Sequence, residues 1–239
     1  MRANQINYKR VLLFIVEGAT EKITLENVFK KNFADKKICF KIVGGDITAE
    51  DSTTEENAES KIYACVRDFL SRNGGFKRSD ITEIIHLTDL DGAFVSDKRI
   101  VFNGGVDLAY EERFIESNKT YKIIERNKRK SAVLSRLSTL GHIRGISYSV
   151  YYFSSNIEHV LYGKKDCGGA EKESLAYEFA KDFTGRETTF CDFLTGQGVA
   201  VDLDYARSWE AAGQGVASLK RRTNINLLFD RINRRKDND

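Results

Sequence analysis

The sequence contains no proline. Its turns and helix ends must therefore come from other signals, since no residue carries proline's fixed φ angle and missing N–H. The sequence also has no stretch approaching 18 consecutive apolar residues, so no segment is predicted to span a membrane. Its start joins a basic beginning to a short apolar run at 11–16. No small-residue cleavage site follows, which favours a buried strand over a signal peptide.

The sequence is also poor in zinc-binding patterns. Its four cysteines are widely scattered without a CxxC pair, and its three histidines form no HExxH or similar grouping. Unpaired, scattered cysteines are typical of a reduced, cytoplasmic compartment. A metal site in this chain would use carboxylates, which favour Mg²⁺ or Mn²⁺ over zinc.

What is present describes an ordinary globular protein. Hydrophobic residues make up 41% of the 239 residues and charged residues 31%. Apolar runs at 11–16, 38–45 and 81–88 predict strands, and residues 20–33 and 60–70 have helical spacing. Strands separated by helices predict an α/β fold with a mostly parallel sheet flanked by helices. Residues 146–156 return to strand-like composition, and residues 175–183 and 219–236 are predicted helices.

An insertion-like region at about 96–145 contains a strongly basic segment. Residues 119–136 hold seven lysines and arginines against one glutamate, a local charge of +6 in a chain of net charge +3. Such a run is either a solvated helix face or a surface that follows nucleic-acid phosphates. The second interpretation assigns nucleic-acid binding to five residues: Lys122, Arg126, Lys128, Arg129 and Lys130.

Acidic residues follow two of the predicted strands. "IIHLTDLDGAFV" at 84–95 ends an apolar run on Asp89 and Asp91, and Glu17 directly follows the first strand. Because parallel strands open their carboxyl ends at one edge of the sheet, these three side chains are expected to meet there. Clustered carboxylates repel one another unless a cation neutralises them. The pattern therefore predicts a site for Mg²⁺ or Mn²⁺, with Gly18 and Gly92 turning the chain away from it.

The stretches "FIVEGATEK" at 14–22 and "DLDG" at 89–92 resemble the two signature motifs of the Toprim domain. The resemblance covers roughly residues 10–160. It implies a Rossmann-like sheet and magnesium-dependent nucleotidyl or phosphodiester chemistry. It also implies that Glu17 is the general acid or base and that Asp89 and Asp91 bind the metal.

Three further residues are candidates near this site, two of them from the same resemblance. "YYFSSNIEHVLYG" at 151–163 is similar to a stretch in small defence-associated Toprim proteins, which places Asn156 and Glu158 near the site. Glu158 is equally explained as an acid in the first turn of a helix. Glu21, one turn after Glu17, is either a further metal-site acid or an exposed helix residue.

Among Toprim proteins, topoisomerases need a separate tyrosine domain and bacterial primases carry a zinc module. Neither is predicted here, which leaves a standalone hydrolytic nuclease. The resemblance is to overcoming-lysogenization-defect, RloB-like and abortive-infection nucleases of phage defence. It implies nucleic acid as a partner, and it is compatible with an ABC-type ATPase partner and with a homodimer. The expected division is a catalytic domain at 1–162, including the basic insertion, and a helical C-terminal region at 163–239.

Two other functions remain open from the sequence. "LTDLDGAF" also resembles the first motif of haloacid-dehalogenase phosphatases, in which the first aspartate is a nucleophile. The threonine expected after that motif is Ala93 here, and the motif lies on the third predicted strand instead of near the amino terminus. The other alternative is a non-catalytic α/β module that binds nucleic acid or protein.

Overall fold

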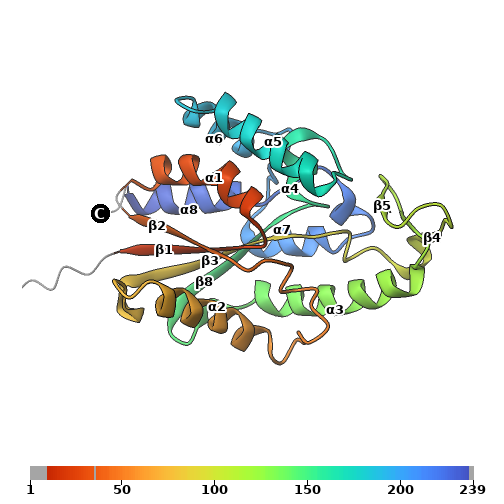
Figure 1. Ribbon diagram of the computed structural model, residues 1–239, viewed down its shortest axis with the longest axis horizontal. Helices are drawn as coiled ribbons and strands as arrows, with labels where there is room; N and C mark the ends of the chain where they lie inside the picture. Colours follow the sequence, from red (N-terminus) through yellow and green to blue (C-terminus); the bar gives the residue numbers. More distant parts are fainter. Residues whose placement is uncertain (1–9, 35, 237–239) are drawn as a thin grey trace, which may run out of the picture.

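Four parallel strands form the centre of a five-stranded sheet (Figure 1). The structure is a computed structural model that describes residues 10–34 and 36–236. In spatial order the strands are β2 (Lys37–Ile42), β1 (Val11–Val16), β3 (Ile81–Asp89), β8 (Ile146–Phe153) and β7 (His142–Ile143). Only β7 runs antiparallel to its neighbour. The predicted α/β class and mostly parallel sheet are confirmed.

The first strand is apolar throughout because both of its faces are covered. Leu13 and Ile15 point into one hydrophobic cluster, and Leu12, Phe14 and Val16 point into the other. Successive side chains of a strand alternate between its faces, so a strand buried on both faces needs an unbroken apolar run.

Helices cover both faces of the sheet (Figure 1). One face carries α1 (Ala19–Asn32), α4 (Ile157–Tyr162), α5 (Gly169–Asp182), α6 (Glu187–Thr195) and α8 (Asn226–Lys236). The other face carries α2 (Ala58–Arg72), α3 (Thr120–Ser138) and α7 (Tyr205–Ala212). None of the helices in the described ranges combines the length and the apolar character needed to cross a lipid bilayer.

The region expected to be an insertion has two parts. Its basic segment is α3, which packs beneath the sheet and connects β3 to the parallel strand β8. This helix is therefore a crossover helix of the main sheet. The true appendage is a small sheet of β4 (Ile100–Phe102), β6 (Ile115–Ser117) and β5 (Ala109–Tyr110), which lies at one end of the molecule (Figure 1). Within residues 10–34 and 36–236 there are also three short 3-10 helices: Arg78–Asp80, Asp97–Arg99 and Ala217–Leu219.

The C-terminal region shares its core with the strands of the first part. Phe229 of α8 stacks on Phe33 at 5.7 Å between ring centroids. The helix expected at 219–236 begins only at Asn226, which corrects that prediction. The preceding residues close the edge of β8 instead: Thr223 Oγ1 donates to the Tyr152 carbonyl at 2.7 Å, and Asn224 Oδ1 accepts from the Tyr152 amide at 2.8 Å. The sequence also predicts that this basic helix ends in a disordered tail, and that tail, from residue 237 onward, lies outside the described residues.

Candidate metal centre

Glu17 bridges the carboxyl ends of two neighbouring strands. Its Oε1 accepts hydrogen bonds from the Asp89 amide at 3.1 Å and from Thr88 Oγ1 at 3.2 Å. The structure thus brings together two residues that are 72 positions apart, as the parallel-sheet argument expects. Glu17 is half-buried and Asp89 is buried.

Glu21 completes a group of three carboxylates. It lies in the first turn of α1, where its Oε2 accepts hydrogen bonds from the Gly18 amide at 3.0 Å and from Thr20 Oγ1 at 3.1 Å. Glu17, Glu21 and Asp89 each offer an oxygen, and these three oxygens lie within 4.8 Å of one another. Glu21 is therefore a member of the cluster and not an exposed helix residue.

The N-terminus of α4 holds Asp89 from the other side. Asp89 Oδ1 accepts a hydrogen bond from the Ile157 amide at 2.9 Å. Asn156 caps this helix, since its Oδ1 accepts from the His159 amide at 2.8 Å. Asn156 thereby sets the position of the amide that contacts Asp89. Glu158 is buried in the first turn of the same helix and forms an ion pair with Lys172 Nζ at 3.1 Å. Because Asn156 and Glu158 flank the Ile157 amide that contacts Asp89, both lie near the cluster.

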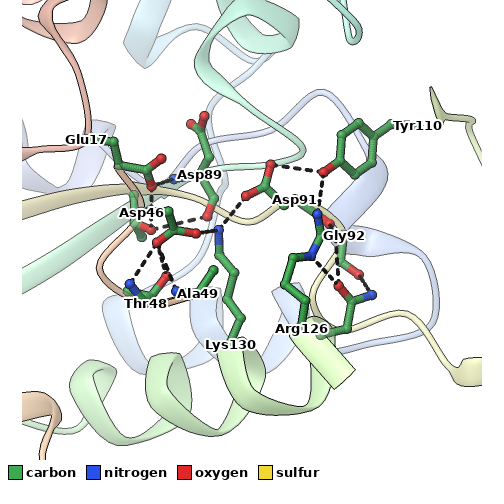
Figure 2. A network of polar contacts seen from close by, with 12 residues as sticks. Glu17, Asp46, Thr48, Ala49, Asp89, Asp91, Gly92, Tyr110, Arg126 and Lys130 are labelled. Carbon is green, nitrogen blue, oxygen red and sulfur yellow. Dashed lines mark hydrogen bonds and ion pairs between the residues drawn. The ribbon is translucent and has the colours of Figure 1, made fainter. Parts of the chain in front are cut away.

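Asp91 faces a different group of residues, shown in Figure 2. Its Oδ2 lies 2.5 Å from Lys130 Nζ, and its Oδ1 accepts a hydrogen bond from Tyr110 Oη at 3.2 Å. Asp91 has a φ of 48°, and Gly92 has a φ of 65°. Two consecutive residues with positive φ turn the chain sharply, so Asp91 is not in the cluster formed by Glu17, Glu21 and Asp89.

Asp46 is an acid of this site that the sequence analysis did not identify. It follows the turn after β2, and its Oδ2 lies 2.5 Å from Lys130 Nζ. Its Oδ1 accepts from the Thr48 amide at 2.8 Å and from Thr48 Oγ1 at 2.6 Å. The signal was available, because Asp46 follows the second parallel strand just as Glu17 follows the first.

Lys130 is not on the basic surface where the sequence analysis placed it. Its side chain is fully buried, and its ammonium lies between Asp46 and Asp91. Arg126 is also drawn inward, donating from Nη1 to Tyr110 Oη at 2.9 Å and from Nη2 to the Asp91 carbonyl at 2.8 Å. These two cations face the acids because α3 packs against the sheet with one side. A solvent-exposed contact of Lys130 with nucleic acid is therefore wrong for this structure.

The other basic residues of α3 differ in their surroundings. Arg129 donates from Nη2 to Asp51 Oδ1 at 2.6 Å, and Lys128 lies 3.6 Å from both Asp97 and Glu125. Lys122 and Lys128 are exposed. The local charge of +6 is thus partly neutralised by acids from distant parts of the chain.

The direction of the pKa shift differs between two groups of acids in this site. Burial, followed by the neighbouring acids, raises the pKa of Glu17 and of Asp89 well above their ordinary values. Burial alone would also raise the pKa of Asp46, but the Lys130 ammonium and the hydrogen bonds from Thr48 lower it below its ordinary value. Lys130 thus neutralises Asp46 through direct contact, whereas it lowers the pKa of Glu17 too little to offset burial and the neighbouring acids.

The donor set fits a hard divalent cation. In the described chain, the hydrogen bonds of the three clustered carboxylates use one oxygen each: Glu17 Oε1, Glu21 Oε2 and Asp89 Oδ1. The second oxygen of each carboxylate is left for a ligand. Three carboxylate oxygens without sulfur or imidazole match Mg²⁺, Mn²⁺ or Ca²⁺.

Comparisons of the chain with protein-family models, with curated proteins and with solved structures found no match.

Proposed function

We propose that this protein is a divalent-metal-dependent phosphodiesterase that cleaves DNA or RNA, with a sheet of the Toprim type. The observation that carries the proposal is the group of Glu17, Glu21 and Asp89, whose ligand oxygens lie within 4.8 Å of one another. The likeness of "VEGATEK" and "DLDG" to the Toprim motifs supports Glu17 and Asp89, and the geometry supports Glu21. Ligands of open α/β sheets bind beyond the carboxyl ends of the strands, which is where these acids lie.

The bound metal would neutralise charge on a scissile phosphate and lower the pKa of a coordinated water. Glu17, Glu21 and Asp89 would hold it through the oxygens that make no hydrogen bonds within the protein. The Ile157 amide favours the ionised form of Asp89, because it donates a hydrogen bond to the carboxylate at 2.9 Å. Glu17 is half-buried and has a raised pKa, so it is also suited to accept a proton from the attacking water.

A nucleic acid would approach along the exposed side of α3. Lys122 and Lys128 are exposed there. Arg126 and Lys130 reach from the same helix to the acidic edge, which is the edge of the sheet that carries Glu17, Asp46, Asp89 and Asp91. Exposed lysines supply contacts to phosphates without reading the sequence of the bases.

The direct test is to incubate the full chain with supercoiled plasmid DNA and with total RNA, each with Mg²⁺, Mn²⁺ or EDTA. Cleavage of at least one substrate is expected with metal and not with EDTA. Asp89→Asn should abolish this cleavage, whereas Glu26→Gln should leave it unchanged. Glu26 is a matched acid on α1 that pairs with Lys30 at 2.8 Å, away from the cluster. Metal-dependent cleavage that survives in Asp89→Asn would contradict the proposal.

A further inference from the structure

A buried ammonium lies between two acids of the candidate centre (Figure 2). Lys130 extends from α3 to the acidic edge, and its Nζ lies 2.5 Å from Asp46 Oδ2 and 2.5 Å from Asp91 Oδ2. Two carboxylates that converge on one point form a site for a hard cation. In this protein a side chain already occupies that point.

The two acids beside Lys130 have no oxygen left for a metal. Asp46 uses Oδ1 for Thr48 and Oδ2 for the lysine. Asp91 uses Oδ1 for Tyr110 and Oδ2 for the lysine. This differs from Glu17, Glu21 and Asp89, each of which keeps one oxygen free of such contacts. The acidic edge therefore has one part built around an ammonium and one part open to an ion.

The lysine is also fixed in place by its own helix. The neighbouring Asn127 donates from Nδ2 to the Gly92 carbonyl at 3.2 Å, and Arg126 donates to the Asp91 carbonyl at 2.8 Å. These contacts attach α3 to the turn that carries Asp91. Displacing the lysine would leave its buried ammonium without partners and would remove the cation that neutralises Asp46 and Asp91, which is strongly unfavourable.

We propose that Lys130 Nζ takes the place of a second divalent cation, so that the centre binds one metal ion. The ion lies at Glu17, Glu21 and Asp89, and the ammonium supplies a permanent positive charge at Asp46 and Asp91. Two-metal phosphodiesterases place their ions about 3.5–4 Å apart, so that two positive charges act on one phosphate. Here the second charge is covalently part of α3. This inference rests on the metal centre proposed above and specifies its composition.

The charge state of the lysine agrees with this assignment. Burial alone would lower the pKa of Lys130, but Asp46, Asp91 and Glu17 raise it above its ordinary value. The side chain therefore stays charged across the physiological range.

The test is to count bound Mn²⁺ in the full chain, by calorimetric titration and by electron paramagnetic resonance of the free ion. The wild-type chain should bind one equivalent. Lys130→Met removes the charge and keeps the length of the side chain, so this variant should bind two equivalents. Lys128→Met is the matched control on the same helix, because Lys128 is exposed and lies 3.6 Å from its nearest acids. It should bind one equivalent, like the wild type.

Thermal melting of the same samples covers the case in which Lys130→Met does not fold without metal. The variant should melt well below wild type in EDTA and regain most of the loss in saturating Mn²⁺, because a second ion restores the missing charge. Two equivalents in the wild type would overturn the proposal. So would one equivalent in folded Lys130→Met, or a variant that stays unfolded at saturating Mn²⁺. A wild-type chain that binds no metal would instead overturn the metal centre itself, and this proposal with it.

Discussion

The two aspartates of "DLDG" should affect the stability of the metal-free protein in opposite directions. Asp89 is buried beside Glu17 and Glu21, whereas Asp91 contacts the buried ammonium of Lys130. Asp89→Asn removes a repelling charge, and the carbonyl oxygen of the introduced amide can still accept from the Ile157 amide. Asp91→Asn removes one of the two charges that neutralise Lys130.

The size of each expected change in the free energy of unfolding follows from the distances between the charges. Two full charges at 4.8 Å, the upper limit of the separation between these oxygens, repel by about 3.5 kcal/mol at an effective dielectric constant of 20. Proton uptake by the raised-pKa carboxylates relieves part of this repulsion, so Asp89→Asn should stabilise the metal-free protein by about 2 kcal/mol. Breaking a buried ion pair costs about 3–5 kcal/mol. Because Asp46 remains as a partner of Lys130, the loss in Asp91→Asn should be at the lower end, about 3 kcal/mol.

The assay is thermal unfolding at pH 7 in EDTA and in Mn²⁺. For a chain of this size, about 2 kcal/mol corresponds to roughly 4–8 °C, so Asp89→Asn should melt above the wild type in EDTA and Asp91→Asn below it. Added Mn²⁺ should raise the melting temperature of the wild type and leave that of Asp89→Asn unchanged. If Asp89→Asn melts below the wild type in EDTA, its charge supports the fold and the repulsion argument is wrong. If Asp91→Asn is as stable as the wild type, the ion pair with Lys130 has no structural role.

Four further outcomes are expected. Glu17→Gln should bind nucleic acid nearly as the wild type does and turn over on the order of a hundredfold more slowly, measured as single-turnover cleavage. Metal affinity should strengthen as pH rises, because Glu17 and Asp89 have raised pKa values and must release protons when the metal binds. Calorimetry in two buffers of different ionisation heat measures the released protons. A metal affinity that does not change with pH would contradict this expectation. Gly92→Ala should lower the free energy of unfolding by on the order of 1–3 kcal/mol. The introduced Cβ would lie 2.7 Å and 2.8 Å from two buried side chains, and Gly92 has a φ of 65°. Gly44→Ala controls for backbone strain alone, since Gly44 has a φ of 86° and open space around it. Lys122→Ala should reduce the log–log salt slope of duplex-DNA binding by up to about 0.9, and an unchanged slope would remove this lysine from the nucleic-acid surface.

The main sheet could be predicted because its signals are local. Residues 11–16 are apolar without interruption, and a strand of that pattern is buried on both faces. The same reasoning brings Glu17 and Asp89 to one edge. It applies equally to Asp46, which escapes notice in the sequence because "GGDIT" has the composition of an ordinary turn.

The role of α3 could not be predicted from composition. A count of charges treats every lysine of residues 119–136 as equivalent, although the helix presents Lys128 to solvent and buries Lys130. Which side of the helix faces the sheet depends on packing of Val133, Leu134 and Leu137 against the core. The acidic partners of Lys130 come from sequence positions 39 and 84 residues away, and no local pattern contains that information.

The backbone of the acidic edge is held in place by contacts within the protein. In the "DLDG" turn, the Leu90 amide donates to the Phe153 carbonyl at 2.9 Å, and the Asp91 amide donates to the Ser155 carbonyl at 2.7 Å. Arg126 holds the same turn from the α3 side through the Asp91 carbonyl. Because these contacts fix the backbone between Asp89 and Asp91, the ion proposed above would meet carboxylates whose backbone is already in position. Under the proposed function, the binding free energy of that ion would be available for neutralising the cluster and the substrate, and little of it would be spent on ordering the turn.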